Sequence, residues 1–386
     1  MNRKLVLPLS DVFATRGGIP RFNQMLCLAL DQLSPSLGLD VVVLSQDDSD
    51  ESWRRQGSPW RHLRFVPANG RARLIRQTLR LCVRERPDLM LVGLLGMAPL
   101  AALCLPWLRI GYGFMAHGFE CWHEPRWSRR WAARRARFVF AVSQNTGQEL
   151  VGATGIRAEI VRLLPNTLDP GFDLPSEREP PPPESGLELL TVSRLWADEN
   201  RKGVDRTLEA FSRLAAQYPS ARYRIVGQGG DKPRLVRLAE SLGLAERVVF
   251  EEDLSDEALA ARYRDCAVFV LPSGQEGFGI VFLEAMRFSK PCIGGRAGGT
   301  PEVVADGETG FLVPFGDVEG LTAALDRLLA NPQLRERMGR AGRRRLIEHF
   351  LFDRFRERLA GYVSEQLGDS VGSGATGGTR PADRDA

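Results

Sequence analysis

The chain has 386 residues, of which 43% are hydrophobic and 26% charged, which excludes a disordered chain and indicates a soluble globular protein. This length favours two domains of ordinary size. The net charge of +4 is unevenly spread: residues 1–170 hold 23 Lys and Arg against 14 Asp and Glu, and the remainder holds 29 against 34. The first half is therefore expected to meet an anionic partner.

The six cysteines and the N-terminus indicate a cytoplasmic protein. The cysteines are dispersed without metal-ligand spacing, as expected for reduced thiols. The apolar stretch in MNRKLVLPLSD is too short for a signal peptide and is better interpreted as a first strand.

In the first half, short apolar runs alternate with amphipathic stretches. Helical patterns lie between most of these runs, including Gly18–Leu33 and Arg71–Arg84. The alternation predicts a parallel sheet wrapped by helices. The predicted strands are Lys4–Leu9, Leu39–Leu44, Leu63–Val66, Asp88–Val92, Arg109–Ala116, Phe138–Val142 and Ala158–Leu163.

One segment, Leu89–Leu108, has twenty residues without a charge and is long enough to cross a bilayer. Gly93, Gly96, Pro99 and Pro106 interrupt it, however. Parallel strands covered on both faces are also continuously hydrophobic. We therefore interpret the segment as a buried strand followed by a short apolar helix from near Met97.

A second alternation follows the proline-rich segment 177–186, which we interpret as a linker between domains 1–176 and 187–350. Helical sequence continues to about residue 366, so residues 351–366 are expected to form a helix returning to the first domain, and the Gly/Ser-rich residues 367–386 a disordered tail. Two facing doubly wound domains would bind a ligand at the carboxyl ends of their strands. The predicted strands are Leu187–Val192, Arg222–Val226, Arg247–Phe250, Val268–Leu271 and Pro291–Gly294; the predicted helices are Val204–Gln217, Lys232–Leu242, Asp256–Tyr263 and Phe278–Phe288.

The stretch SGQEGFGIVFLE places Glu276 and Glu284 around an expected helix start near Phe278. Backbone N–H groups of Gly277, Phe278 and Gly279 would face a ligand there. Two carboxylates at such a position suit a polyhydroxylated ligand, because each accepts several hydroxyl hydrogen bonds. The alternative is a solvated glutamate beside an ordinary glycine turn.

Three further features fall at strand ends facing the expected cleft. Arg194 and Lys202 flank a strand–helix junction and suit a diphosphate, although both could be solvated surface cations. Gly17 and Gly18, in TRGGIP, would let a phosphate approach a helix start, or form only a turn. His117 follows a strand in AHGFE and could be a structural hydrogen-bonding residue instead of a functional one.

Together these motifs resemble the retaining glycosyltransferases of family 4, over about residues 1–365. The resemblance implies the GT-B fold, an α/β architecture of two facing Rossmann-like domains with a cleft between them. The most specific part runs from Pro272 to Pro314. The other motifs are Gly17-Gly18, HGFE at His117, SRL…KG from Ser193 to Gly203, and VGQG at Gly227.

The resemblance also implies a role for each site residue. Glu276 would contact the transferred sugar and Glu284 the nucleotide ribose, with His117 near the sugar's reacting face. Arg194 and Lys202 would clamp the diphosphate; their separation is longer than in many members, so Arg201 could share the lysine's role. The implied reaction moves a hexose from a UDP- or GDP-sugar with retention at the anomeric carbon, and without a metal or cofactor. The glycines of the donor site would be Gly17, Gly18, Gly227, Gly277 and Gly279, with Phe278 between the last two.

Three alternatives remain open. Asp48-Ser49-Asp50 matches the DxD pattern of metal-dependent glycosyltransferases, but it lies in an acidic loop expected to be solvated. The same fold hosts sugar-nucleotide epimerases, which need additional acid/base carboxylates. A catalytically silent subunit that binds a partner glycosyltransferase is the third possibility.

The acceptor side is indicated by the segment Trp127–Arg137, whose composition is helical. A helix carrying aromatic and cationic residues can lie on an anionic leaflet, and Arg71–Arg86 adds a second basic stretch. We expect peripheral association with the inner membrane face and a lipid-linked or saccharide acceptor in cell-surface polysaccharide or glycolipid synthesis. The alternative is a solvated helix with its tryptophans in the core; nucleic acid is not expected. The surface residues are Trp127, Arg129, Arg130, Trp131, Arg134 and Arg135.

Overall fold

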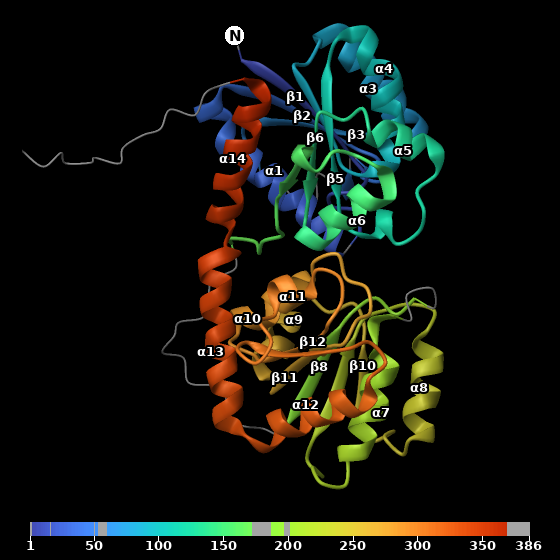
Figure 1. The fold of residues 1–386 in the computed structure, drawn as a ribbon, viewed down its shortest axis with the longest axis vertical. Coiled ribbons are helices and arrows are strands. Elements are labelled where there is room, and N and C mark those ends of the chain that lie inside the picture. The colour runs from blue at the N-terminus through green and yellow to red at the C-terminus, as the bar shows by residue number, and fades with distance from the viewer. Residues whose placement is uncertain are drawn as a thin grey trace, which may run out of the picture.

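The computed structural model describes residues 2–15, 17–49, 51–52, 60–171, 187–196 and 201–368, without the side chains of 104–106. The predicted linker 177–186 and nearly all of the predicted tail lie outside these ranges. The described chain forms two α/β domains stacked end to end, as Figure 1 shows. We call them the N-terminal and C-terminal domains.

The N-terminal domain is built on a seven-stranded parallel sheet in the order β3-β2-β1-β4-β5-β6-β7. Helices cover both faces, which explains why its strands are nearly continuous runs of buried apolar residues. The strands are β1 (Arg3–Leu9), β2 (Leu39–Ser45), β3 (Leu63–Pro67), β4 (Leu89–Val92), β5 (Gly111–Ala116), β6 (Phe138–Ala141) and β7 (Val161–Leu163). The helices are α1 (Gly18–Leu37), α3 (Arg71–Glu85), α4 (Ala98–Leu108), α5 (Trp127–Ala133) and α6 (Gln144–Thr154).

The C-terminal domain repeats this plan with a six-stranded parallel sheet in the order β10-β9-β8-β11-β12-β13. Its strands are β8 (Glu188–Val192), β9 (Arg222–Val226), β10 (Val248–Glu251), β11 (Val268–Leu271), β12 (Cys292–Gly295) and β13 (Gly310–Val313). Its helices are α7 (Val204–Leu214), α8 (Lys232–Ser241), α9 (Asp256–Asp265), α10 (Ile280–Arg287), α11 (Thr300–Val303), α12 (Val318–Ala330) and α13 (Pro332–His349).

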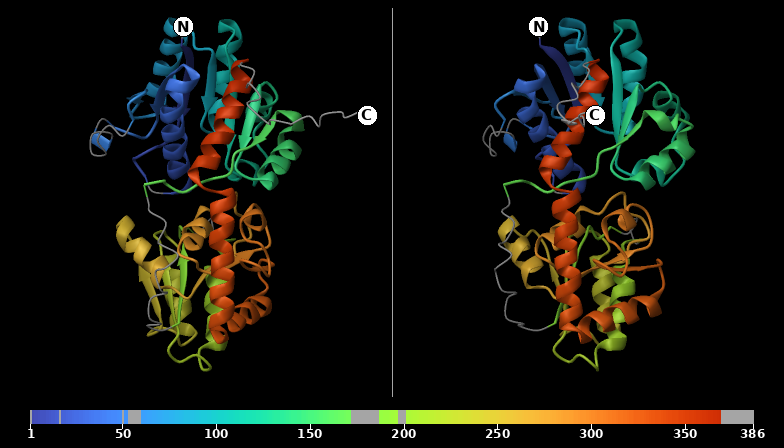
Figure 2. Two further views of the ribbon diagram at one scale, coloured as in Figure 1. Left: turned by 90° about the vertical axis from the view of Figure 1, so that its left-hand side faces the viewer. Right: turned by 60° about the vertical axis from the view of Figure 1, so that its left-hand side comes forward.

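The last helix, α14 (Phe352–Leu367), crosses back and lies along α1 of the N-terminal domain, as the two views in Figure 2 show. Arg162 pairs with Glu365 at 2.5 Å, and the Tyr362 hydroxyl donates to the Leu163 carbonyl at 3.1 Å. A single cluster of buried apolar residues contains members from both domains. Within it, the rings of Phe22 in α1 and Phe355 in α14 lie 5.7 Å apart.

Most predicted strands are present within one or two residues, and both sheets are parallel as expected. The uncharged segment Leu89–Leu108 forms the buried strand β4, a short 3-10 turn and α4. No helix in the described part of the chain is long and apolar enough to cross a membrane.

Two helix boundaries differ from the prediction, and two elements were missed. The helix expected from Phe278 begins at Ile280, because Gly279 adopts a left-handed backbone with φ of 94°. The helical segment expected to reach Arg137 ends at Ala133. Helix α6, capped by the Ser143 side chain, and strand β13 were not predicted.

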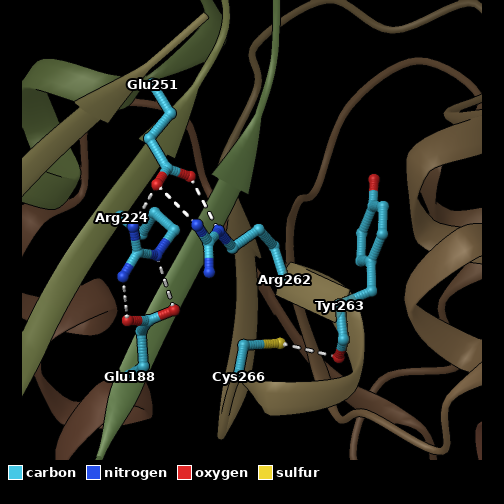
Figure 3. Close-up of polar contacts among 6 residues, drawn as sticks. All are labelled: Glu188, Arg224, Glu251, Arg262, Tyr263 and Cys266. Atoms are coloured by element: carbon cyan, nitrogen blue, oxygen red, sulfur yellow. Dashed lines mark hydrogen bonds and ion pairs between the residues drawn. The ribbon is translucent and has the colours of Figure 1, made fainter. Parts of the chain in front are cut away.

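An ion-pair network ties strands β8, β9 and β10 to helix α9 (Figure 3). Arg224 lies between Glu188 at 2.9 Å and Glu251 at 2.6 Å, and Arg262 of α9 reaches Glu251 at 2.8 Å. The side chains of Arg224 and its two partners are 16–18% exposed. The network therefore fixes α9, which carries Tyr263, against the sheet.

Replacing Arg224 by alanine should destabilise the protein by about 3 kcal/mol, because the largely buried Glu188 would lose its cation and Glu251 would keep only Arg262. Arg354→Ala is the control, since that arginine pairs with Glu357 on the surface and such a pair contributes less than about 1 kcal/mol. Denaturant unfolding measures both variants. Equal effects would show that the network does not stabilise the fold.

Candidate functional site

The candidate site lies where the carboxyl ends of the strands of both domains meet. In each sheet the order reverses at the first strand of the domain, between β1 and β4 and between β8 and β11. Ligands of doubly wound folds bind at this switch point. The loop before α1 follows β1, His117 follows β5, Ser193–Trp196 follow β8, and Pro272–Gly279 follow β11.

The first glutamate of the predicted pair is held by the predicted lysine. The Nζ atom of Lys202 lies 2.8 Å from Oε2 of Glu276, and their side chains are 14% and 18% exposed. The Gly274 N–H donates to the Arg201 carbonyl at 2.7 Å, which joins the two loops. The structure thus brings a carboxylate and a cation together at the point where the sequence predicts sugar and diphosphate binding.

The loop after Glu276 lies directly against the N-terminal domain. The Gly277 carbonyl accepts hydrogen bonds from the Ser143 hydroxyl at 2.7 Å and the Thr146 hydroxyl at 3.2 Å. A Cβ atom on Gly277 would lie 1.8 Å from the His117 carbonyl oxygen. Any side chain at Gly277 would therefore force the two loops apart, so glycine is required by the close approach of the domains.

The second glutamate, Glu284, lies in α10 and contacts both domains. The Tyr263 hydroxyl donates to its Oε2 at 2.7 Å. Arg21, from α1 of the N-terminal domain, lies 3.2 Å from its Oε1 and 3.4 Å from Asp256. A hollow beside these groups is also lined by Leu168, Leu259, Arg287 and Phe288.

Another carboxylate forms a contact between the domains. Glu302, just inside α11, accepts from the backbone N–H groups of Gln144 and Asn145 at 2.8 and 2.9 Å. These groups open helix α6 and have no partner within the helix, so a carboxylate satisfies them well. The contact adds a third polar link across the cleft.

His117 presents a neutral imidazole at the cleft. Burial lowers its pKa to about 4, although a hydrogen bond with the Gly93 backbone acts in the opposite direction. Its Nε2 atom is buried and makes no hydrogen bond to any described residue. The Phe22 ring packs edge-on against it at 5.0 Å. A neutral ring with one unsatisfied nitrogen can exchange a hydrogen bond with a ligand at neutral pH.

Glu120, the last residue of HGFE, fixes the turn that carries His117. Its Oε2 accepts from the His117 backbone N–H at 3.0 Å, and the side chain is buried. Burial raises the pKa of this carboxyl to about 7, while backbone hydrogen bonds and the charge of Arg129 oppose the shift.

The remaining predicted donor residues lie around the same cleft. Arg194 is exposed just beyond β8, and residues 197–200 between it and Lys202 lie outside the described ranges. Gly17 and Gly18 lead into α1. At Gly227 a Cβ atom would meet the Ser193 carbonyl oxygen at 1.8 Å, so the loops after β8 and β9 can approach only without a side chain there.

The expectation of a solvated DxD loop is wrong for Asp48. This residue is fully buried and accepts from the backbone N–H groups of Val12 and Phe13 at 2.8 and 2.9 Å. The Ser45 hydroxyl also donates to it at 2.6 Å. Asp48 therefore holds the loop before α1 in place. Among the described residues, no group of three His, Cys, Asp or Glu is arranged to hold a metal ion.

The predicted acceptor surface is only partly available. Trp127 is 79% exposed, whereas Trp131 is half-buried under the Arg135 guanidinium. Arg130 pairs with Glu124 at 3.2 Å, and Arg134 donates to the Thr154 carbonyl. Arg129 is exposed.

Sequence reasoning missed several residues that the fold brings to the site. Arg21 could have been noticed three residues after Gly18, but nothing local shows that it reaches Glu284. Tyr263, Ser143 and Thr146 lie on other elements and carry no motif. Glu120 belongs to the HGFE motif, but nothing in the sequence indicates its role.

Two parallel-sheet domains with a shared cleft define the GT-B class of folds. The family model for Glycosyltransferase Family 4 matches residues 16–172, and the model for glycosyl transferases group 1 matches residues 176–345. The two models together span most of the chain, which belongs to glycosyltransferase family 4.

Relatives and a solved structure agree with this assignment. The chain is 34% identical over 266 residues to a GDP-mannose-dependent alpha-(1-6)-phosphatidylinositol monomannoside mannosyltransferase of Mycolicibacterium smegmatis, covering 62% of this chain and 66% of the relative. It is 37% identical over 185 residues to a D-inositol 3-phosphate glycosyltransferase of Thermobifida fusca, covering 46% and 42%. The matches thus span less than two thirds of these relatives' length. The structure of Anabaena HepE in complex with UDP has the same fold, with a TM-score of 0.73, 21% identity, and coverage of 94% of this chain and 100% of HepE.

The Glu120 carboxyl gives a pH-dependent prediction. Between pH 4.5 and 7 the unfolded chain releases this proton and the folded chain keeps it, so stability falls as pH rises. The glutamine of Glu120→Gln does not titrate, so the variant does not lose stability in this way. Its free energy of unfolding, relative to that of the wild type, should therefore rise by about 2 kcal/mol from pH 5 to pH 8. Denaturant unfolding at the two pH values measures it. A difference that does not change with pH would contradict a raised pKa at Glu120.

Proposed function

We propose that the protein is a retaining glycosyltransferase that moves a hexose from a UDP- or GDP-sugar to a lipid-linked or saccharide acceptor. The observation that carries the proposal is the meeting of Glu276, Lys202 and Glu284 with His117 in one interdomain cleft. The family models support the activity, and the name of the mycobacterial relative, which specifies GDP-mannose, supports a nucleotide-sugar donor.

In this proposal Glu276 anchors the hydroxyls of the transferred sugar and Glu284 holds the ribose. Lys202 and Arg194 stabilise the diphosphate as it leaves and gains charge, without a metal or cofactor. The domain contacts position the sugar and the acceptor next to each other, which lowers the entropic part of the barrier. His117 offers its Nε2 atom to a sugar hydroxyl as a neutral partner. The leaving phosphate takes the acceptor's proton on the same face of the sugar, so Glu276 is an anchor and not a covalent nucleophile.

The donor can be identified by thermal shift with a panel of UDP- and GDP-sugars, because a true ligand stabilises the folded protein by mass action. One sugar nucleotide should stabilise the protein and be slowly hydrolysed. Glu276→Ala and Glu276→Gln should lower turnover by at least about 100-fold, whereas Glu308→Ala, an exposed control in the same domain, should not. Formation of a new sugar isomer would indicate an epimerase, and no binding to any donor would indicate a silent subunit.

We also propose that the N-terminal domain docks on an anionic membrane surface. Helix α4 packs against both α3 and α5. Trp107 of α4 is 90% exposed, and Leu103 of α4 and Trp127 of α5 are exposed as well. Helix α3 adds five exposed arginines, Arg71, Arg73, Arg76, Arg80 and Arg84. Interfacial tryptophans with nearby cations suit a leaflet of anionic lipids. The phosphatidylinositol-based acceptor in the relative's name is consistent with an acceptor in that leaflet.

Vesicle flotation tests the membrane proposal. The protein should float with vesicles containing anionic lipid at low salt, less at high salt, and not with neutral vesicles. The double variant Trp107→Ala/Trp127→Ala should lose most of this binding. Trp196→Ala, at an exposed tryptophan of the C-terminal domain, should retain it. Absence of flotation with anionic vesicles, or equal flotation of both variants, would contradict the proposal.

A further inference from the structure

Arg21 is the one side chain of α1 for which the structure records ion pairs across the cleft. It is the fourth residue of the helix, directly after the TRGGIP loop. Its guanidinium lies 3.2 Å from Glu284 and 3.4 Å from Asp256, both in the C-terminal domain. The Glu284 charge is the largest influence on Arg21 and raises its pKa. The cation of one domain is therefore matched to the carboxylates of the other.

Tyr263 holds the other oxygen of Glu284. Its side chain is buried, its hydroxyl donates at 2.7 Å, and its ring stacks on Phe288. Burial and the Glu284 charge raise its pKa, so the hydroxyl stays protonated and remains a donor. Helix α9 is fixed behind it by the Arg262–Glu251 pair (Figure 3). Tyr263 is thus a rigid donor and not a mobile surface group.

The two contacts leave defined acceptor positions on Glu284. An ionised carboxylate has about four lone-pair sites, two on each oxygen. The Tyr263 hydroxyl donates to Oε2, and the Arg21 guanidinium forms an ion pair with Oε1 at 3.2 Å. Each oxygen therefore keeps at least one acceptor site, which is the pattern needed by two adjacent hydroxyl donors, as in the diol of a ribose.

We propose that Arg21 is a positioning residue for nucleotide recognition, supplied by the N-terminal domain. It acts with Tyr263 to orient Glu284 so that both remaining acceptor sites face the ribose diol. The proposal rests on the proposed function, in which Glu284 binds the ribose. Because Arg21 belongs to the opposite domain, the ribose subsite is complete only when the two domains are in contact.

A competing role makes the opposite prediction. If Arg21 instead occupied the place of the ribose, the nucleotide would have to break the Arg21–Glu284 pair in order to bind. Removing the guanidinium would then strengthen nucleotide binding. If Arg21 is a positioning residue, its removal should weaken nucleotide binding.

Calorimetric titration of the full chain with UDP and GDP, and with the 2′-deoxy form of whichever binds, separates the two roles. The wild type should bind the ribonucleotide more tightly than the deoxynucleotide. Arg21→Gln should weaken ribonucleotide binding about 10-fold, the loss expected for a hydrogen bond to a charged group. It should leave deoxynucleotide binding nearly unchanged, so that the ribose preference falls. Tyr263→Phe should act in the same direction.

Two matched controls exclude a general effect on folding. Arg162→Gln removes another arginine–glutamate pair, between β7 and α14, and Tyr362→Phe removes another tyrosine hydroxyl bonded between these elements. Both should keep the wild-type ribose preference. Tighter nucleotide binding by Arg21→Gln, or an unchanged preference, would overturn the proposal.

Glu284→Gln distinguishes failure of this inference from failure of the proposed function. If Glu284→Gln keeps the wild-type ribose preference, Glu284 does not hold the ribose and the assignment of the donor site fails. If Glu284→Gln loses the preference and Arg21→Gln keeps it, the donor site stands and only the role of Arg21 is wrong.

Discussion

The candidate site depends on the close approach of two backbone loops, one from each domain. Gly277 lies so near the His117 carbonyl that no side chain fits between them. This contact brings the HGFE turn against the loop that carries Glu276. The hydroxyls of Ser143 and Thr146 donate to the Gly277 carbonyl, so this acceptor stays paired where the loops meet.

Charge compensation organises the cleft around this contact. Glu276 is paired with Lys202 within the C-terminal domain, and Glu284 is paired with Arg21 across the domains. Each carboxylate is largely withdrawn from water and would be costly there without its cation. The same carboxylates keep free acceptor sites, which lets them serve as binding groups for hydroxyls. Stability and ligand recognition therefore use the same residues.

The sequence predicted the parts of the site that are local. Alternating apolar runs define the parallel sheets because buried parallel strands have a distinctive composition, and glycine-rich turns mark strand ends. Glu276, Lys202 and His117 could be found because each follows a strand whose carboxyl end faces the cleft.

Contacts between distant segments could not be predicted in this way. Arg21 meets Glu284 after a separation of 263 positions, and the packing of the two domains against each other brings the two residues together. The burial of Asp48 depends on the loop before α1 folding over it, which an acidic sequence does not suggest. The start of α10 moved by two residues because a single glycine, Gly279, adopts a left-handed backbone.

The most direct test of the central claim is a crystal structure of the protein with bound UDP or GDP. The diphosphate should lie beside Lys202 and Arg194, and the ribose hydroxyls should lie within hydrogen-bond distance of Glu284. A nucleotide bound outside the cleft, or bound with its ribose directed away from Glu284, would contradict the assignment of the donor site.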